Sequence, residues 1–199
     1  MAGKYNGGLT REQFLFYEIR TVASLLCSGL SREEVVERIR EENLFQFPTE
    51  RMTVSIAGTC FKRIDALESD VLVQLLANAP ADVAKQVNLY AMMKYNRIVW
   101  DFMTMVIGEK FRTQAFDFSR RDLNLFFFDL QEQNEEIASW SDATILKIKQ
   151  VLTRILVECE YLDSVRATQL NAVTIAPELE DEIRADNDLA ALPAFNCFR

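Results

Sequence analysis

The sequence predicts a mainly α-helical fold, a helical bundle with a helix-turn-helix-like unit at each end. Three observations predict it. Apolar residues recur at helical spacing along most of the 199 residues, and Ser or Thr stands before several of these segments, where helices begin. Glycine and proline, at six and four residues, are too few for many short strands joined by turns.

Capping boxes mark the first two helices. In this motif a Ser or Thr hydroxyl and the side chain three positions on bond to each other's backbone amides. T-R-E-Q predicts a helix from Thr10 with Gly29 as its left-handed stop, and S-R-E-E opens a short helix at Ser31. A third helix, about Thr49–Leu67, is expected to bury Met52, Ile56, Cys60, Phe61, Ile64 and Leu67. Three helices with tight joints outline a helix-turn-helix over residues 1–68.

Residues 69–116 are expected to form a central helical block. Its helices are predicted at Asp70–Ala77, at Ala81–Tyr95, and through Trp100 to about Phe111. The most apolar window, Ile98–Ile107, covers about half a membrane span and is interrupted by Asp101. It is therefore expected to be a buried helix and not a membrane anchor.

Residues 117–177 are expected to form the second helix-turn-helix-like unit. Ser119 and Ser141 each stand before a helix, the second of them long. The stretch TQLNAVTI then alternates weakly, with Asn171 available for a turn, which would give this unit a short β-hairpin as a wing. The tail, residues 178–199, is predicted to be a short acidic helix and a loose end.

Composition excludes several classes of function. The chain has no histidine, which rules out a Ser-His-Asp triad, a Cys-His dyad and a His-ligated zinc ion. A formal charge of −8 argues against a protein that coats nucleic acid without specificity. The charge is segregated, however, with seven basic and three acidic residues between Lys85 and Arg121 and six acidic and two basic residues from Glu178 onward.

One side of the third predicted helix carries a candidate DNA contact. At 100° per residue, four polar residues fall opposite the buried side: Arg51, Ser55, Thr59 and Lys62. Small polar side chains with a cation at each end can approach a DNA groove closely, because Arg and Lys pair with phosphates or guanine and the hydroxyls bond to phosphate or a base. The alternative is an ordinary solvated helix face.

The long helix after Ser141 repeats this design. Its outer side carries Lys147, Gln150 and Arg154, and Gln can bond adenine bidentately while the cations suit phosphates. Acidic residues that follow directly, from Glu158, would repel a DNA backbone. A solvated face is again the alternative.

A third candidate is the stretch from Lys110 to Arg121. Basic residues alternate there with aromatic ones: Lys110, Arg112, Arg120 and Arg121 with Phe111, Phe116 and Phe118. Such a pattern can stack on unpaired bases and add nucleic-acid contacts. The alternative is that the rings pack inward at a joint between helical units.

Catalytic and metal sites find little support in the sequence. Adjacent carboxylates such as Glu33-Glu34 point in different directions on a helix, and no phosphate-binding glycine loop or calcium loop is present. We therefore expect no enzyme, cofactor, metal ion or small-molecule substrate. The four cysteines lie far apart without a C-x-x-C motif, which indicates reduced thiols, and no secretory signal begins the chain. A cytoplasmic location without membrane contact is expected.

The chain resembles the BREX phage-exclusion protein A family (BrxA), small proteins of bacterial anti-phage loci. Four stretches and the P-E-L at Pro177 carry the resemblance: Tyr5–Leu26, Glu41–Leu67, Val87–Phe111 and Ile145–Asp163. It implies an all-helical fold likened to the NusB antitermination factor, helix-turn-helix elements, DNA binding and a role in phage restriction. The family offers no catalytic residues to carry over. Older labels place such proteins in the inner membrane, which the apolar pattern of this sequence contradicts.

The leading hypothesis is a non-enzymatic protein that binds duplex DNA in a BREX-type defence system, with other BREX proteins as further partners. Arg51, Ser55, Thr59 and Lys62 would contact DNA from the first unit, and Lys147, Gln150 and Arg154 from the second. Two alternatives stay open. One is a scaffold that holds defence proteins together, and the other is RNA binding through a NusB-like helical surface.

Overall fold

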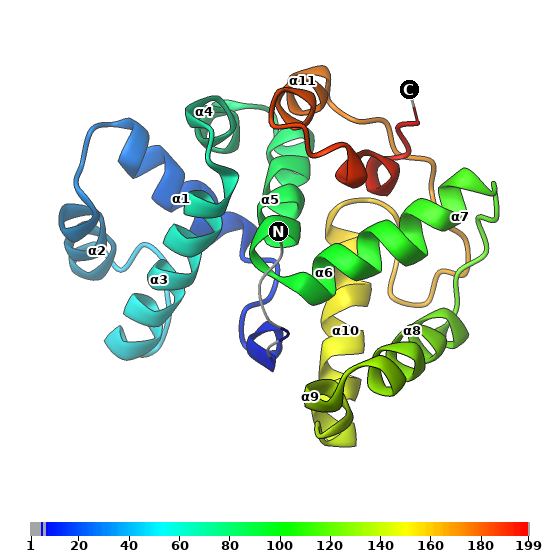
Figure 1. The fold of residues 1–199 in the computed structure, drawn as a ribbon. Helices are drawn as coiled ribbons and strands as arrows, with labels where there is room; N and C mark the ends of the chain where they lie inside the picture. The colour runs from blue at the N-terminus through cyan, green and yellow to red at the C-terminus, as the bar shows by residue number, and fades with distance from the viewer. Residues whose placement is uncertain (1–4, 6, 199) are drawn as a thin grey trace. The chain divides into compact units, whose positions relative to one another are not determined.

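The computed structural model describes residues 5 and 7–198, and α-helices dominate this part of the chain (Figure 1). Their bounds are α1 Phe16–Cys27, α2 Arg32–Glu41, α3 Glu50–Leu67, α4 Asp70–Asn78, α5 Ala81–Tyr95, α6 Arg97–Asp101, α7 Gly108–Arg112, α8 Arg120–Gln133, α9 Glu135–Ala138, α10 Asp142–Glu158 and α11 Pro177–Ala185. A π-helical segment, Phe102–Ile107, joins α6 to α7, and 3₁₀ segments cover Gly7–Thr10 and Leu189–Phe195. The predicted mainly α fold is confirmed.

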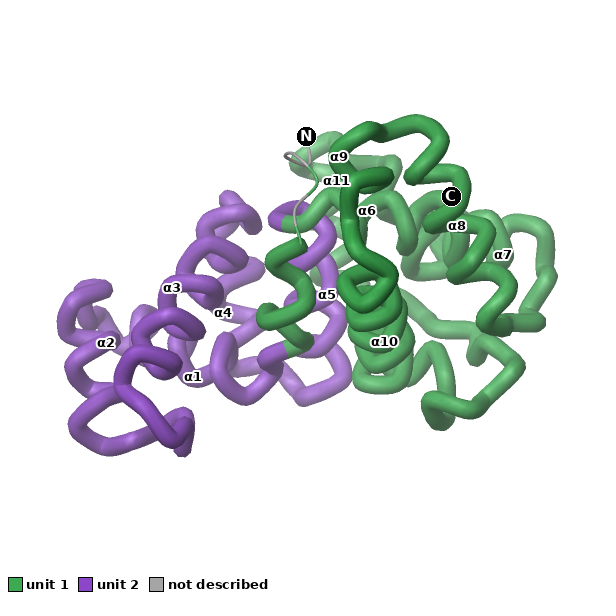
Figure 2. The backbone as a smooth tube through the Cα atoms, turned by 90° about the horizontal axis from the view of Figure 1, so that it is seen from below, with its two compact units in different colours: residues 1–14, 96–199 green, residues 15–95 purple. Residues whose placement is uncertain are grey.

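The chain forms two compact units (Figure 2). Unit 1 comprises Met1–Phe14 and Asn96–Arg199, and unit 2 comprises Leu15–Tyr95. Unit 2 is therefore an insertion in the sequence of unit 1. The boundaries of these units differ from those of the four predicted segments. Residues 69–95 belong to the same unit as the first three helices, and the tail belongs to the same unit as the second helix-turn-helix-like segment.

Unit 2 consists of α1 to α5. Helix α1 packs against α3 and α4, and α5 packs against the same two helices. Residues 87–93 of α5 are buried on all sides. The linker between α1 and α2, residues 28–31, is as short as the turn of a helix-turn-helix, about three or four residues, whereas the linker between α2 and α3, residues 42–49, is longer.

Local capping signals place most helix ends where the sequence predicted them. Gly29 adopts a φ of 92°, and Ser31 forms the predicted capping box with Glu34. The hydroxyls of Thr49 and Ser141 accept from the amides of Met52 and Thr144, as expected of N-caps. Ser119 likewise caps α8 in a capping box with Asp122.

The predicted start of the first helix at Thr10 is wrong. The Thr10 hydroxyl donates to the carbonyl of Gly7 at 2.9 Å, within the 3₁₀ segment, and α1 begins only at Phe16. Leu15 has a left-handed φ of 51°, which prevents a helix from running through from Thr10. Thr10 consequently belongs to unit 1 and α1 to unit 2.

In unit 1, α6, the π-helical segment and α7 form one continuous rod (Figure 1). The 3₁₀ segment Leu189–Phe195 packs against this rod, with Leu192 and Phe195 buried. A Cβ on Gly108 would lie 2.9 Å from Cβ of Pro193, so only glycine fits there without displacement. The predicted loose end is therefore wrong, because apolar burial fixes the tail. Across the described residues, none of the helices combines the length and the apolar character needed to cross a bilayer.

The predicted β-hairpin wing does not form in the described residues. TQLNAVTI does not fold back on itself but pairs with the segment before α8. Leu170 donates its amide to the carbonyl of Phe116 at 2.7 Å, and Phe118 donates to Thr168 at 2.9 Å, around an isolated antiparallel bridge between Asp117 and Gln169. The start of this stretch, residues 168–170, therefore pairs with residues 116–118 and forms no wing.

Candidate nucleic-acid interface

The outer side of α3 presents the first candidate contact surface. Arg51, Ser55 and Lys62 are exposed, and Gly58 lies between them on the same side. We call these four residues the α3 stripe. At a rise of about 1.5 Å per residue, its two cations start about 16 Å apart along the helix axis. Among the described residues, no hydrogen bond or ion pair engages either cation.

The carboxylates nearest to the α3 stripe are neutralised by α2. Glu50, which precedes Arg51, forms an ion pair with Arg40 at 2.8 Å. Asp65, one turn beyond Lys62, pairs with Arg32, whose guanidinium also lies 5.2 Å from the ring centre of Phe61. The cations of the α3 stripe are thus not screened by unpaired neighbouring carboxylates.

Two residues of α3 differ in burial from the prediction. Thr59 is 5% exposed, and its hydroxyl donates to the carbonyl of Ser55 at 3.3 Å, so it faces the core and is not a surface contact. Met52, predicted to be buried, is 43% exposed, as is the neighbouring Val54 at 45%. On the helical wheel Thr59 lies at the edge of the outer side, so the packing of α3 against its neighbours decides whether this side chain is buried or exposed.

Gly58 gives the centre of the α3 stripe its low profile. A Cβ built on Gly58 would meet no atom within 4 Å, so packing inside the protein does not require a glycine. Glycine in a helix interior costs about 0.5–1 kcal/mol relative to alanine. The glycine therefore leaves the helix backbone open to close approach from outside.

Helix α10 presents the second candidate surface. Lys147, Gln150 and Arg154 are all exposed and share one side of the helix, and we call them the α10 stripe. Glu158 lies on this side in the last turn of α10, Glu160 follows just after the helix, and both are exposed. The α10 stripe therefore has a cationic centre and an acidic end.

A neighbouring lysine of α10, Lys149, has a different environment. Its Nζ donates to Oδ1 of Asn124 at 2.9 Å and lies 5.3 Å from the ring centre of Phe127, both on α8. Partial burial lowers the pKa of Lys149 below its usual value. The negative charge of Asp142 acts in the opposite direction but is the smaller effect. Lys149 therefore connects α10 to α8 and is not part of the α10 stripe.

The third candidate, Lys110 to Arg121, is largely taken up inside unit 1. Nζ of Lys110 donates to the carbonyl of Asp117 at 2.7 Å and forms an ion pair with Asp122 at 2.8 Å, with both ionic side chains mostly buried. Burial alone would raise the pKa of Asp122, but the hydrogen bonds from Lys110 and Ser119 outweigh it and hold that pKa below its usual value. Lys110 is therefore a structural residue, and its ion pair argues against the predicted nucleic-acid contact.

The aromatic residues of this stretch pack inward, which confirms the alternative interpretation of the pattern. Phe111 lies 6.1 Å from Phe116 and 5.9 Å from Tyr161 between ring centres, and Phe118 lies 6.4 Å from Phe102. Phe111 and Phe118 are buried, so these two rings cannot stack on bases, whereas Phe116 is half-buried.

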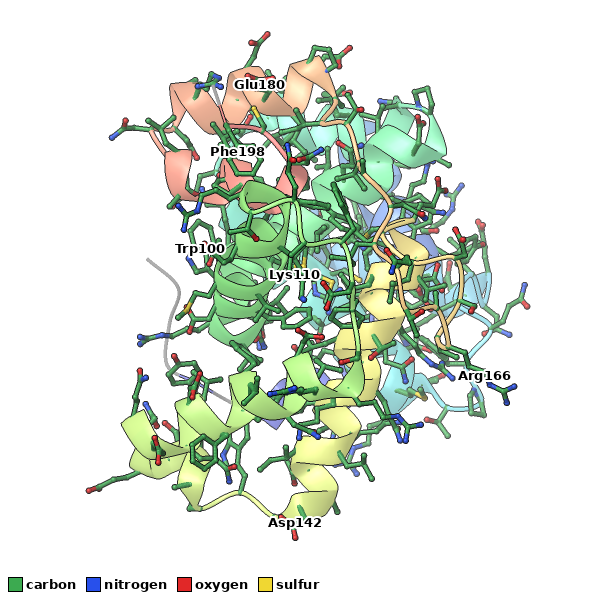
Figure 3. The ribbon with its side chains drawn as sticks, turned by 90° about the vertical axis from the view of Figure 1, so that its right-hand side faces the viewer. Trp100, Lys110, Asp142, Arg166, Glu180 and Phe198 are labelled. Carbon is green, nitrogen blue, oxygen red and sulfur yellow. The ribbon has the colours of Figure 1, made fainter. Side chains whose placement is uncertain are left out.

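The four predicted basic contacts of this stretch therefore differ in availability. Lys110 is buried in an ion pair, and Arg112 is exposed but held by Glu109 at 2.6 Å. Arg120 and Arg121 are exposed on the first turn of α8. Figure 3 shows Lys110 within the body of unit 1 and Arg166 projecting from the loop after α10, a cation that the sequence pattern did not single out.

A further exposed surface, on α8, was not predicted from the sequence. Leu125 and Phe128 on α8 are 51% and 56% exposed, although their neighbours Phe126 and Phe127 are buried. The signal was present, because three consecutive Phe residues span about 200° of a helix and cannot all face one core.

The fold and these surfaces define an all-helical protein of two units, with exposed cationic helix faces on α3 and α10. Residues 3–187 match the model of the BrxA family. A relative from Bacillus cereus (strain H3081.97), named BREX protein BrxA, is 33% identical over 185 residues, 92% of each chain. The chain belongs to the BrxA family, which confirms the resemblance seen in the sequence.

More distant relatives carry the same name. BREX protein BrxA of Paramagnetospirillum magneticum (strain ATCC 700264 / AMB-1) is 24% identical, over 86% of this chain and 85% of that protein. BREX protein BrxA of Escherichia coli O9:H4 (strain HS) is 25% identical, over 87% of this chain and 81% of that protein. A crystal structure of an uncharacterized protein from Magnetospirillum magneticum shares the fold, with a TM-score of 0.82 at 22% identity over 97% of this chain and 98% of the other. The likeness to NusB stays a prediction.

Proposed function

We propose that this chain is a non-enzymatic DNA-binding component of a BREX anti-phage defence system, acting in the cytoplasm. Membership of the BrxA family supports the role in defence. The same membership supports other BREX proteins as its protein partners. Duplex DNA is the nucleic acid that the exposed helix faces suit best.

The α3 stripe carries the proposal. Its two exposed cations lie about 16 Å apart along the helix, which exceeds the roughly 12 Å width of the major groove, so each can reach a phosphate on one wall. Ser55 and Gly58, which lie between the two cations, are small, so the helix can enter the groove. The pairing of Glu50 and Asp65 with arginines of α2 removes the nearest repulsion.

The α10 stripe is a second DNA contact in this proposal. Lys147 and Arg154 would bind phosphates, while Gln150 would meet a base edge. The exposed carboxylates that end α10 weaken this surface, so we expect it to contribute less affinity than the α3 stripe. Arg120, exposed at the start of α8, could add a phosphate contact.

Duplex binding across a salt series tests the proposal. We expect the double variant Arg51→Ala/Lys62→Ala to bind more weakly and to lower the slope of log affinity against log salt by about 0.9 for each phosphate that is no longer neutralised. The matched control is Arg38→Ala/Arg97→Ala. It removes the same number of exposed cations, but each of them is already paired with a carboxylate. It should leave the slope nearly unchanged.

Two results would contradict the proposal at different levels. An equal decrease of affinity in the test and control variants would mean that only net charge matters and would remove the α3 stripe from the site. Absence of duplex binding by the unmodified protein near physiological salt would overturn DNA binding altogether and favour the scaffold role.

A further inference from the structure

Helix α8 bears an apolar surface that the described residues leave uncovered. Leu125 and Phe128 are neighbours on successive turns, and each is more than half exposed. Large apolar side chains that lie side by side and exposed on a helix mark a contact surface more often than single ones do. The opposite side of α8 buries Leu123, Phe126, Phe127 and Leu130, so the helix is apolar on both sides.

A third apolar side chain belongs to the same region. Leu146 on α10 is 58% exposed. The hydrogen bond between Lys149 and Asn124 joins the two helices one turn from Leu146 on α10 and one turn from Phe128 on α8. The uncovered apolar area therefore extends from α8 toward α10.

A charged residue flanks this apolar surface toward each end of α8. Arg121 and Glu132 lie on the same side of the helix as Leu125 and Phe128, in the order Arg, Leu, Phe, Glu at spacings of four, three and four residues. Both charged side chains are exposed. We call these four residues the α8 stripe.

The α8 stripe is symmetric about its midpoint. Arg121 and Glu132 are equally far from the point between Phe126 and Phe127, and so are Leu125 and Phe128. If a second α8 packs against the first in antiparallel orientation, its Glu132 meets Arg121 at one end and its Arg121 meets Glu132 at the other. Leu125 then meets the second Phe128 at the centre. Such a contact is self-complementary, as a twofold interface must be.

We propose that α8 is the surface through which two copies of this chain associate as an antiparallel, twofold-symmetric dimer. The charge complementarity of the α8 stripe with itself selects a second copy as the occupant. The contact is small for a stable interface, even with Leu146 at its edge, so the dimer forms and dissociates with protein concentration. Arg121 acts as a protein contact in this dimer and not as a nucleic-acid contact.

Sedimentation velocity of the full chain without DNA tests the dimer independently of the proposed function. The weight-average sedimentation coefficient should rise from the monomer toward the dimer value as the concentration increases from about 1 to about 300 μM, the range of weak associations. Phe128→Glu should weaken the association by about tenfold or more, because it places a charge at the apolar centre. Val165→Glu, at a side chain that is 60% exposed on a loop, is the matched control and should not change it.

Charge reversal provides the sharper test. Arg121→Glu should weaken the association by roughly fivefold, because like charges then face each other at both ends of the contact, and Glu132→Arg should do the same. The double variant Arg121→Glu/Glu132→Arg restores opposite charges and should restore the dimer. Far-UV circular dichroism verifies that each variant is folded.

Three results would overturn the dimer. They are a monomer at every concentration, an association that Phe128→Glu leaves unchanged, and a double reversal as weak as the single ones. The last result would mean that Arg121 and Glu132 do not pair across the contact, because the double reversal keeps the net charge of the unmodified protein.

Discussion

The two helical glycines Gly58 and Gly108 receive opposite predictions for the same substitution. Gly108→Ala places a Cβ 2.9 Å from Cβ of Pro193, 3.1 Å from its carbonyl carbon and 3.3 Å from the amide nitrogen of Ala194. A proline ring and backbone atoms cannot rotate away as a flexible side chain can. The 3₁₀ segment is also held by the buried Tyr161, whose hydroxyl donates to the carbonyl of Ala194 at 2.9 Å.

The magnitudes follow from these surroundings. Overpacking costs about 1–3 kcal/mol, and the gain in helix propensity returns about 0.5–1 kcal/mol, so Gly108→Ala should lower the free energy of unfolding by about 1–2 kcal/mol. Gly58→Ala meets no atom within 4 Å and should keep the whole gain, about 0.5–1 kcal/mol. For a protein of this size these changes shift the midpoint of thermal unfolding by about 2–4 °C per kcal/mol.

Two optical signals separate the units in this experiment. Both tryptophans, Trp100 and Trp140, belong to unit 1, so selectively excited tryptophan fluorescence follows the unit that contains Gly108. Far-UV circular dichroism follows the helices of both units. Urea unfolding with both signals should show Gly108→Ala lowering the fluorescence midpoint, while Gly58→Ala changes only the circular dichroism curve. A Gly108→Ala protein at least as stable as the unmodified one would refute the packing of the tail on α7.

Three further predictions concern local contacts. Lys110→Met should lower the stability of unit 1 by about 1–3 kcal/mol by leaving Asp122 mostly buried and unpaired. In the unmodified protein the pKa of Asp122 is lower than that of an ordinary carboxyl group. The ionised carboxylate therefore stabilises the fold above the ordinary carboxyl pKa, and this stability is lost as the pH falls through the pKa of the folded state. Urea unfolding at neutral and at acid pH measures both effects. Burial and the hydrogen bond to Asp101 raise the pKa of Tyr5 to about 12. The unmodified protein should therefore lose stability as the pH rises from about 10 through 12. Tyr5→Phe should remove this loss, which unfolding curves at alkaline pH would measure. Ser31→Ala should cost about 1 kcal/mol by removing the cap of α2, and faster hydrogen exchange confined to the amides of α2 would show it, whereas unchanged exchange would contradict the capping role.

Helix starts were predictable because their causes are local. Ser31, Thr49, Ser119 and Ser141 each cap a helix with a hydroxyl that reaches an amide two or three residues away, so the sequence contains the whole interaction. Thr10 had the same signature and failed. Leu15 turns left-handed where the chain passes from one unit to the other, which no local motif reveals.

The exposed cations were predictable in part. Helical periodicity placed Arg51 and Lys62 on an outer side because the buried residues of α3 fix its orientation. The pattern could not settle Thr59 at the edge of that side. It also could not foresee that Lys110 pairs with Asp122, because that interaction depends on how the loop after α7 returns to α8.

The insertion of unit 2 into the sequence of unit 1 has a consequence for the order of folding. Tyr5 and the segment Gly7–Thr10 complete a unit made mostly of residues from Asn96 onward, since this segment packs on α10 and Tyr5 bonds to Asp101. During synthesis, residues 15–95 can therefore fold while the ribosome is still extending the chain, and the leading segment must wait for α10. A shortening of the chain at its beginning would accordingly damage the half of the protein that is made last.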